Sequence, residues 1–162
     1  MVVFDATMLS LLLRPGSKPP PDPATGQPVD HAEVRTAHLV ERLEKSRTII
    51  IVPTPVLSEL LIKAGTAGNT FVARLQKSSV FRIQPFDVRA AVELAQITNA
   101  IASPNDKRAA IDAPWSKIKF DRQIVAIAKV HVATAIYTDD AKLIAFAHMC
   151  DIHCIRLADL PI

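Results

Sequence analysis

Aromatic residues and cysteines are scarce in this sequence, and each shortage argues against a class of site. Only 5% of the 162 residues are aromatic, so stacking of nucleobases on an aromatic platform is not the obvious binding mode. The two cysteines, Cys150 and Cys154, lie near His148 and His153. This spacing is not the usual zinc pattern, and a strand would point neighbouring side chains to opposite faces. We favour two buried thiols in a reducing cytosol over the alternative of a zinc site.

Long hydrophobic runs and a secretion signal are also lacking. No apolar run reaches the roughly 18 residues of a membrane span, and the N-terminus has no basic region or cleavage site. We therefore expect a cytoplasmic protein with no membrane association. With 49% hydrophobic and 22% charged residues, the chain should fold as one globular domain over residues 1–162. The net charge of +3 is compatible with a polyanionic partner.

Hydrophobic segments of strand and helix type alternate along the chain. β-Branched and apolar runs predict strands, and amphipathic runs between them predict helices. The expected strands are 2–4, 48–52, 79–86, 133–138 and 151–157, and the expected helices are 6–13, 31–46, 55–64, 69–77, 87–102, 117–131 and 139–149. This order predicts an α/β three-layer sandwich with a mostly parallel central sheet.

Helix-capping residues and two long loops punctuate this pattern. Asp30 is predicted to cap the helix from 31, with Glu33 completing a capping box. Thr54 fits the N-cap of the helix from Pro55, and Asp87 fits that of the helix that follows it. Residues 15–30 hold half of the twelve prolines and form a long loop insertion. A second polar loop spans 103–116.

Acidic residues occur where apolar ones are expected. Asp5 follows the first buried strand, and Asp139 and Asp140 follow the strand at 133–138, at the strand ends where parallel sheets form ligand sites. Glu59 and Asp121 lie on apolar helix stripes, because their neighbours three or four positions away are aliphatic. A lone carboxylate on a core face costs several kcal/mol unless it is paired.

Each acid also has an ordinary explanation. Asp121 could favour the positive end of its helix, Glu59 could pair with a nearby base, and Asp139 or Asp140 could cap a helix. Four separate segments nevertheless bring a carboxylate to the edge of the core, and clustered carboxylates need protons or a cation. Mg²⁺ or Mn²⁺ would fit oxygen ligands and could activate water for phosphodiester cleavage.

Four motifs carry a resemblance to a known family. VVFDATMLSLLL, TPVLSELL, KFDRQIVAIAKV and IYTDDAKLIAFA together resemble, in order and spacing, the PIN-domain nucleases, and within them the VapC-type toxins of bacterial toxin–antitoxin pairs. The resemblance implies a sandwich fold and Mg²⁺- or Mn²⁺-dependent cleavage of RNA. It also implies a possible antitoxin partner whose tail crosses the acidic groove.

Transferred residue by residue, the resemblance makes Asp5, Glu59, Asp121 and Asp140 the metal-holding catalytic acids. The family pattern Thr-x-Asp favours Asp140, and Asp139 stays a secondary metal candidate. Thr138 would orient an acid or a water. Three basic residues beside the third acid could meet phosphates or could simply belong to a solvated helix face: Lys117, Lys119 and Arg122.

Several alternatives remain open. Both long loops depart from the compact toxin pattern and should lie near the mouth of the site, and PIN domains also serve RNA processing. A non-catalytic module that binds RNA or protein is a second possibility. A haloacid-dehalogenase phosphatase is a third, although DATML lacks the second acid of its DxDx[TV] motif. Leu9, Leu12 and Leu13 could serve a partner or a homodimer, but core packing is the simpler interpretation.

Overall fold

Five strands form one sheet in which every strand runs parallel to its neighbours, in the order β3-β2-β1-β4-β5. The computed structural model describes residues 1–101, 108–109 and 111–162. The strands are β1 (Val2–Phe4), β2 (Ile50–Pro53), β3 (Phe81–Gln84), β4 (Ala135–Tyr137) and β5 (Cys154–Ile155). The predicted parallel α/β sandwich is confirmed.

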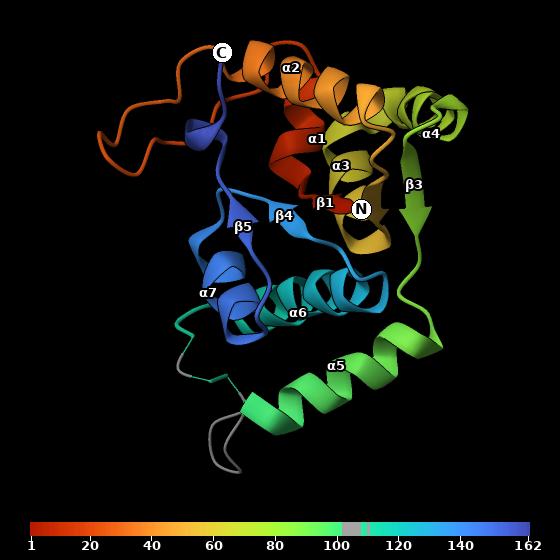
Figure 1. Cartoon of the computed structure of the whole chain (residues 1–162), viewed down its shortest axis with the longest axis vertical. Coiled ribbons are helices and arrows are strands. Elements are labelled where there is room, and N and C mark those ends of the chain that lie inside the picture. The colour runs from red at the N-terminus through yellow and green to blue at the C-terminus, as the bar shows by residue number, and fades with distance from the viewer. Residues whose placement is uncertain (102–107, 110) are drawn as a thin grey trace.

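Helices cover both faces of this sheet (Figure 1). One layer contains α1 (Ala6–Leu13), α2 (Ala32–Lys45), α3 (Thr54–Ala64), the 3₁₀ turn η1 (Gly65–Ala67) and α4 (Gly68–Lys77). The other contains α5 (Val88–Ile101), α6 (Trp115–Val130) and α7 (Ala141–Met149). A second 3₁₀ turn, η2 (Leu157–Asp159), packs against α2.

The central strands are apolar on both faces because each face meets helices. Every residue of β1, β2 and β4 is buried. Burial extends to α6, where Ile124–Ala128 are all buried, since this helix lies between the sheet and α5 and packs sideways against α7. The candidate acids Asp5 and Asp140 lie where such strands end and helices begin.

Two of the predicted helix caps are wrong. The N-cap of α2 is His31, in a left-handed backbone conformation (φ 55°) and without a side-chain cap bond, and not Asp30. Glu33 forms no capping box; its Oε1 accepts from the Gly16 N–H at 2.9 Å and so ties the Pro-rich loop to α2. Thr54 is already helical, and its hydroxyl accepts from the Phe86 N–H.

Other local predictions are confirmed or shortened. Asp87 caps α5 by accepting from the Ala90 N–H at 3.0 Å. The predicted strand at 151–157 contracts to the two residues of β5, because Asp151 turns the chain with a left-handed φ of 58°. The sequence pattern identified each element but not its ends.

The Pro-rich loop has local structure of its own. Within 15–30, the chain turns back on itself at an antiparallel bridge between Pro21 and Pro28, and Val29 is buried. Of the loop predicted at 103–116, positions 103–107 and 110 lie outside the described residues. Its end belongs to α6, which begins at Trp115 rather than at 117.

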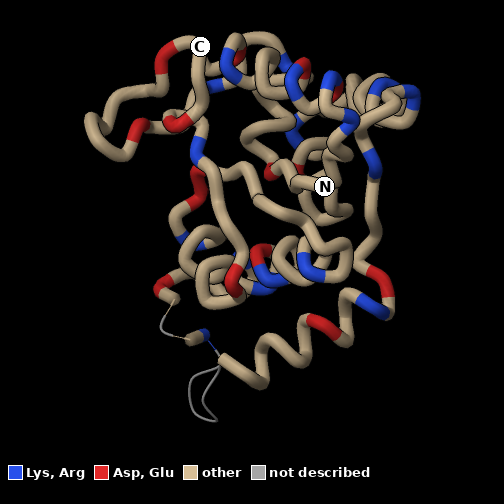
Figure 2. Tube along the Cα trace, viewed as in Figure 1, with Lys and Arg blue, Asp and Glu red and all other residues tan. Residues whose placement is uncertain are grey.

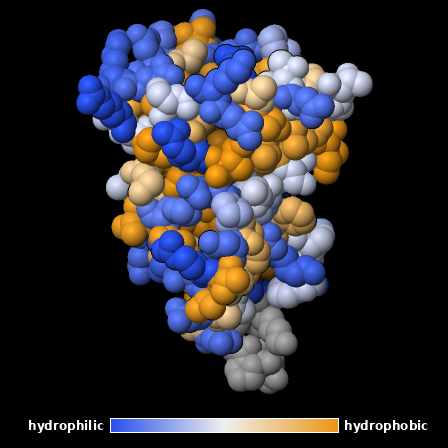
Figure 3. Space-filling model, turned by 90° about the vertical axis from the view of Figure 1, so that its right-hand side faces the viewer, coloured by the Kyte–Doolittle hydropathy of each residue, from blue (hydrophilic) through white to orange (hydrophobic). Residues whose placement is uncertain are grey.

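Charge and hydropathy are distributed unevenly over the surface. The α4 helix carries Lys and Arg and no acid (Figure 2). On the side that turns the β3 edge outward, hydrophobic patches lie among hydrophilic residues (Figure 3). Arg82 is exposed on this edge strand, where a charge discourages pairing with another sheet. Within the described ranges, no helix is long and apolar enough to cross a membrane.

Candidate functional site

Asp5 and Asp140 each end a strand and begin a helix. Asp5 follows β1 and its Oδ1 accepts from the Met8 N–H at 2.9 Å, which caps α1. Asp140 follows β4 and its Oδ1 accepts from the backbone N–H groups of Lys142 and Leu143 at 2.8 and 3.2 Å, which caps α7. Both carboxylates are therefore fixed by free N–H groups at helix N-termini.

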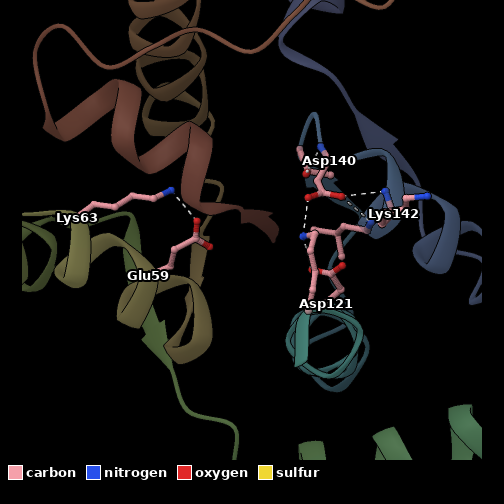
Figure 4. A network of polar contacts seen from close by, with 8 residues as sticks. Glu59, Lys63, Asp121, Asp140 and Lys142 are labelled. Carbon is pink, nitrogen blue, oxygen red and sulfur yellow. Dashed lines mark hydrogen bonds and ion pairs between the residues drawn. The ribbon is translucent and has the colours of Figure 1, made fainter. Parts of the chain in front are cut away.

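Asp121 meets Asp140 through a shared lysine. The Lys117 Nζ lies 3.2 Å from Asp121 Oδ1 and 2.7 Å from Asp140 Oδ2. Asp121 is 6% exposed, as its apolar helix neighbours predicted. Figure 4 shows Asp121 on α6 and Asp140 before α7 directed toward the same space. One cation thus already bridges two acids from separate segments.

Glu59 lies differently from the prediction. It is not on a buried face: its side chain is 54% exposed, and Ile62 on the same supposed stripe is 81% exposed. Its Oε1 pairs with Lys63 Nζ at 2.6 Å, one turn along α3. Figure 4 shows Glu59 across the open space from Asp121 and Asp140. The alternative prediction, that Glu59 pairs with a nearby base, is confirmed.

A groove of about 380 Å³ separates α3 from the start of α6. Glu59 lines one wall, and Lys117 and Asp121 line the other. None of residues 15–30 lines this groove. The prediction that the Pro-rich loop lies at the mouth of the site is therefore wrong. Larger hollows elsewhere lack these acids.

Burial shifts the proton affinity of the acids. It raises the pKa of Asp121 to about 6, against the opposing effect of the Lys117 charge. It also raises the pKa of Asp5 to about 6, against hydrogen bonds from Thr138 and Met8. Burial acts on Asp140 too, but the hydrogen bond from Lys117 and the α7 N–H groups outweigh it and lower that pKa. Asp121 and Asp5 therefore carry more proton affinity than ordinary aspartates.

The residues around β4 divide into two roles. Both carboxylate oxygens of Asp139 accept from the Leu157 N–H, at 3.2 and 3.3 Å, so Asp139 holds the chain after β5 and does not cap α7. The Thr138 hydroxyl accepts from the Asp140 N–H at 3.1 Å and bonds Asp5. Thr138 therefore links two of the candidate acids, whereas Asp139 faces another partner.

The three basic residues of α6 have three environments. Lys117 bridges the acids, and Lys119 is exposed. Arg122 is only 3% exposed and lies over the rings of Trp115 and Phe146, at 5.6 and 5.0 Å. The prediction that Arg122 meets phosphates, or lies on a solvated face, is wrong, because Trp115 and Phe146 of α7 cover its side chain.

The donor set suits a hard divalent cation. All donors are carboxylate oxygens, and the Lys117 ammonium shows that a positive charge fits between Asp121 and Asp140. Across the described part of the chain, no three His, Cys, Asp or Glu side chains converge on one point. Mg²⁺ commonly takes only one or two carboxylates and keeps waters, so this pair fits such an ion.

The two cysteines and three leucines of the first helix were also assigned roles by sequence, and all of them lie outside the groove. Cys150 is buried and Cys154 is partly buried, and both are free thiols. Leu9 and Leu13 belong to the core, whereas Leu12 is partly exposed and lines a groove of about 400 Å³ between α1, α2 and α4. Core packing thus accounts for two of these three leucines.

One feature of the site escaped sequence reasoning. The bridge from Lys117 to both acids was not foreseen, although Lys117 was considered as a phosphate ligand. The spacing of four residues between Lys117 and Asp121 signals an ion pair on a helix. Its second contact, to Asp140, joins positions 23 residues apart and depends on the packing of α6 against α7.

Comparison with known proteins gives one family match and a set of similar folds. The sequence profile of the PIN domain family matches residues 29–149, which include Glu59, Asp121 and Asp140 but not Asp5. No protein of curated function shows detectable similarity to the chain.

Three solved structures share the fold at low sequence identity. VapBC2 from Rickettsia felis, bound to promoter DNA, has a TM-score of 0.61 and 12% identity over 96% of this chain and 98% of its own. DNA-bound VapBC from Salmonella typhimurium scores 0.56 with 16% identity over 96% and 97%. Mycobacterium tuberculosis VapC20, a toxin that cleaves the sarcin–ricin loop, scores 0.53 with 15% identity over 90% and 94%.

Proposed function

The chain belongs to the PIN domain family, and we propose that it is a Mg²⁺- or Mn²⁺-dependent endoribonuclease. The observation that carries this proposal is the shared cation position of Asp121 and Asp140, beside a groove whose far wall presents Glu59. Acids on both walls of an open groove are suited to an ion that must also meet an extended phosphodiester.

Asp121 and Asp140 would hold the ion, and Glu59 and Asp5 are the further acids of the site. When bound, the ion supplies a water of lowered pKa and neutralises charge on the phosphate. Asp140 keeps its orientation through the α7 N-terminus, and Thr138 fixes its backbone relative to Asp5. Asp139 is the weaker metal candidate because its carboxylate binds the Leu157 N–H, whereas Asp140 shares a lysine with Asp121.

Lys117 has a second task in this proposal. Its Nζ is the counter-charge of the two acids. If Asp121 and Asp140 held a divalent ion instead, Lys117 would be able to turn toward the groove that it already lines. There an ammonium can contact a phosphate oxygen. Lys119, two residues further along α6, is exposed and would add to the electrostatic attraction for the RNA backbone.

We place the nuclease in a toxin–antitoxin pair. The support is the likeness of the whole fold to VapBC and VapC structures. An antitoxin protein and a second copy of the chain are the partners that this assignment implies. An RNA-processing role for the same active site is the alternative, whereas the phosphatase alternative has no support from the PIN match.

The test is cleavage of a mixed RNA pool with Mg²⁺, with Mn²⁺ and with EDTA. Wild type should cut internally only with metal, and Asp121→Asn should bind metal more weakly in calorimetry and cut little. Asp112→Asn is the matched control, because Asp112 is exposed and does not line the groove. Wild-type cutting that is unchanged in EDTA would end the metal assignment. The toxin assignment predicts that the gene adjoins a small reading frame and that co-expression of its product abolishes cutting.

A further inference from the structure

The few aromatic side chains of this protein are not distributed evenly between core and surface. Of eight (six Phe, one Trp and one Tyr), four are buried and two are partly buried: Phe4, Phe81, Tyr137 and Phe146, and Phe71 and Phe86. Trp115 and Phe120 are 38% and 49% exposed, and both belong to α6. The two most exposed aromatic side chains therefore both lie on the helix that carries Asp121.

Phe120 is the aromatic residue whose position matters for substrate. It precedes Asp121 in the chain, and both line the groove between α3 and α6. Trp115, in contrast, already covers the Arg122 guanidinium at 5.6 Å and is absent from the lining. A large apolar ring that stays half exposed forgoes the favourable free energy of burying that surface.

The walls of the groove combine apolar surface with hydroxyl groups. Ile62, which is 81% exposed, faces the groove from α3, and Phe120 faces it from α6. Ser58 and Ser116 line the same space. An apolar slot with a few hydrogen-bonding groups is suited to a planar heterocycle, which presents an apolar face and a polar edge.

We propose that Phe120 receives an unpaired nucleobase of the RNA, next to the phosphate that is cut. This inference rests on the proposed ribonuclease function and deepens it by assigning a base-contacting residue to the same groove. A nucleotide carries its base one sugar away from its phosphate, so a phosphate at Lys117 and Asp121 brings an adjacent base to the neighbouring Phe120. A base in a duplex is covered on both faces and cannot reach the ring, whereas an unpaired base can stack on it.

The experiment measures binding and cleavage of one unstructured RNA oligonucleotide separately. Binding is followed by fluorescence anisotropy without added metal, and cleavage is followed with Mg²⁺. Phe120→Ala should weaken binding about tenfold, in line with the loss of one stacked base. Phe120→Tyr keeps the ring and should stay within about twofold of wild type, whereas Phe120→Leu should resemble Phe120→Ala. Val92→Ala, on an exposed position of α5 outside the groove, is the control and should change nothing.

An abasic substitution beside the cut site identifies the contacted base. At the correct position, wild type and Phe120→Ala should bind the abasic RNA equally. The base is absent in both cases, so the presence or absence of the Phe120 ring no longer affects stacking. Equal binding of intact RNA by wild type and Phe120→Ala would overturn the proposal, and so would full binding by Phe120→Leu. A change in the sedimentation mass of Phe120→Ala with unchanged RNA binding would make this face a contact between copies instead.

The two readouts keep the two proposals apart. If the binding pattern holds but wild type cuts nothing with metal, the base subsite stands and the nuclease proposal falls. If wild type cuts with metal and Phe120→Ala both binds and cuts the RNA equally well, the nuclease stands and the base subsite falls.

Discussion

The two walls of the groove each carry a carboxylate with a lysine four residues away, yet the two pairs are not equivalent. Glu59 and Lys63 on α3 are 2.6 Å apart, with side chains 54% and 46% exposed. Asp121 and Lys117 on α6 are 3.2 Å apart, and Asp121 has only 9% of its side chain exposed. Distance alone would rank the α3 pair as the stronger one.

Burial reverses that ranking. An ion pair in water contributes little, since solvent screens it and both long side chains lose freedom. Asp121 is desolvated, so its charge interacts strongly with whatever cation is present, and its raised pKa records the cost of leaving that charge alone. The α6 wall is therefore a prepared cation site, whereas the α3 wall is a solvated acid that can turn toward an arriving ligand.

The largest expected effect is on the α6 wall. Asp121→Asn should lower RNA cleavage by at least about a hundredfold, because loss of a direct ligand should cost no less than loss of the groups that orient it. The melting temperature without metal should not fall at pH 7.5, since a buried charge is removed. Steady-state cleavage and a thermal melt measure the two effects, with Asp112→Asn as control. Cleavage within about threefold of wild type would make Asp121 structural.

A change of pH should act on the α6 wall, because burial raises the pKa of its Asp121 to about 6, and it should also act on Asp5 after β1, whose pKa is raised to about 6 by burial as well. Protons compete with metal for these acids, so cleavage and metal affinity should fall by at least about tenfold per pH unit below pH 6. The metal-free fold should respond in the opposite sense. Its stability from these groups is complete near pH 4 and is lost as the pH rises through 6, because the folded state binds the extra protons. Cleavage rates and metal-free melts from pH 5 to 8 measure both trends. Parallel trends would show that other groups dominate.

A smaller effect is expected on the α3 wall. Glu59→Gln should reduce cleavage by about tenfold or less, because an exposed acid that is already paired with Lys63 would contribute less than a buried direct ligand. Its melting temperature should match that of wild type, since the Glu59–Lys63 pair is solvated. The cleavage assay at saturating Mg²⁺ tests this. A loss as large as that of Asp121→Asn would remove the distinction between the two walls.

The smallest effect concerns the lysines themselves. Lys117→Met should destabilise the metal-free protein by about 1 kcal/mol, or roughly 2–4 °C, because Asp121 and Asp140 lose their shared counter-charge. Added Mg²⁺ should restore most of this loss, since it takes the same position. Lys63→Met is the matched control and should change neither value. Thermal melts with and without Mg²⁺ measure both, and a destabilisation that Mg²⁺ leaves intact would argue against a shared cation position.

Local sequence pattern determined much of this protein. Runs such as VVF and the apolar strand before Thr54 can only be buried, so the alternation of strands and helices, and from it the parallel sheet, could be predicted. The strand-end positions of Asp5 and Asp140 followed in the same way, as did the burial of Asp121. Each of these depends on interactions within one element or one turn.

Only the tertiary structure decided the rest, because it depends on which elements pack together. Glu59 lies between Val56, which is buried, and Ile62, which is 81% exposed, so the stripe that the sequence predicts to be apolar opens to water at its C-terminal end. Arg122 reads as a surface base, but α7 and Trp115 enclose it. The second contact of Lys117 arises where α6 packs against α7. The groove that Phe120 and Asp121 line arises where α3 faces α6. Both depend on segments far apart in the chain, so spacing within one segment carries no record of them.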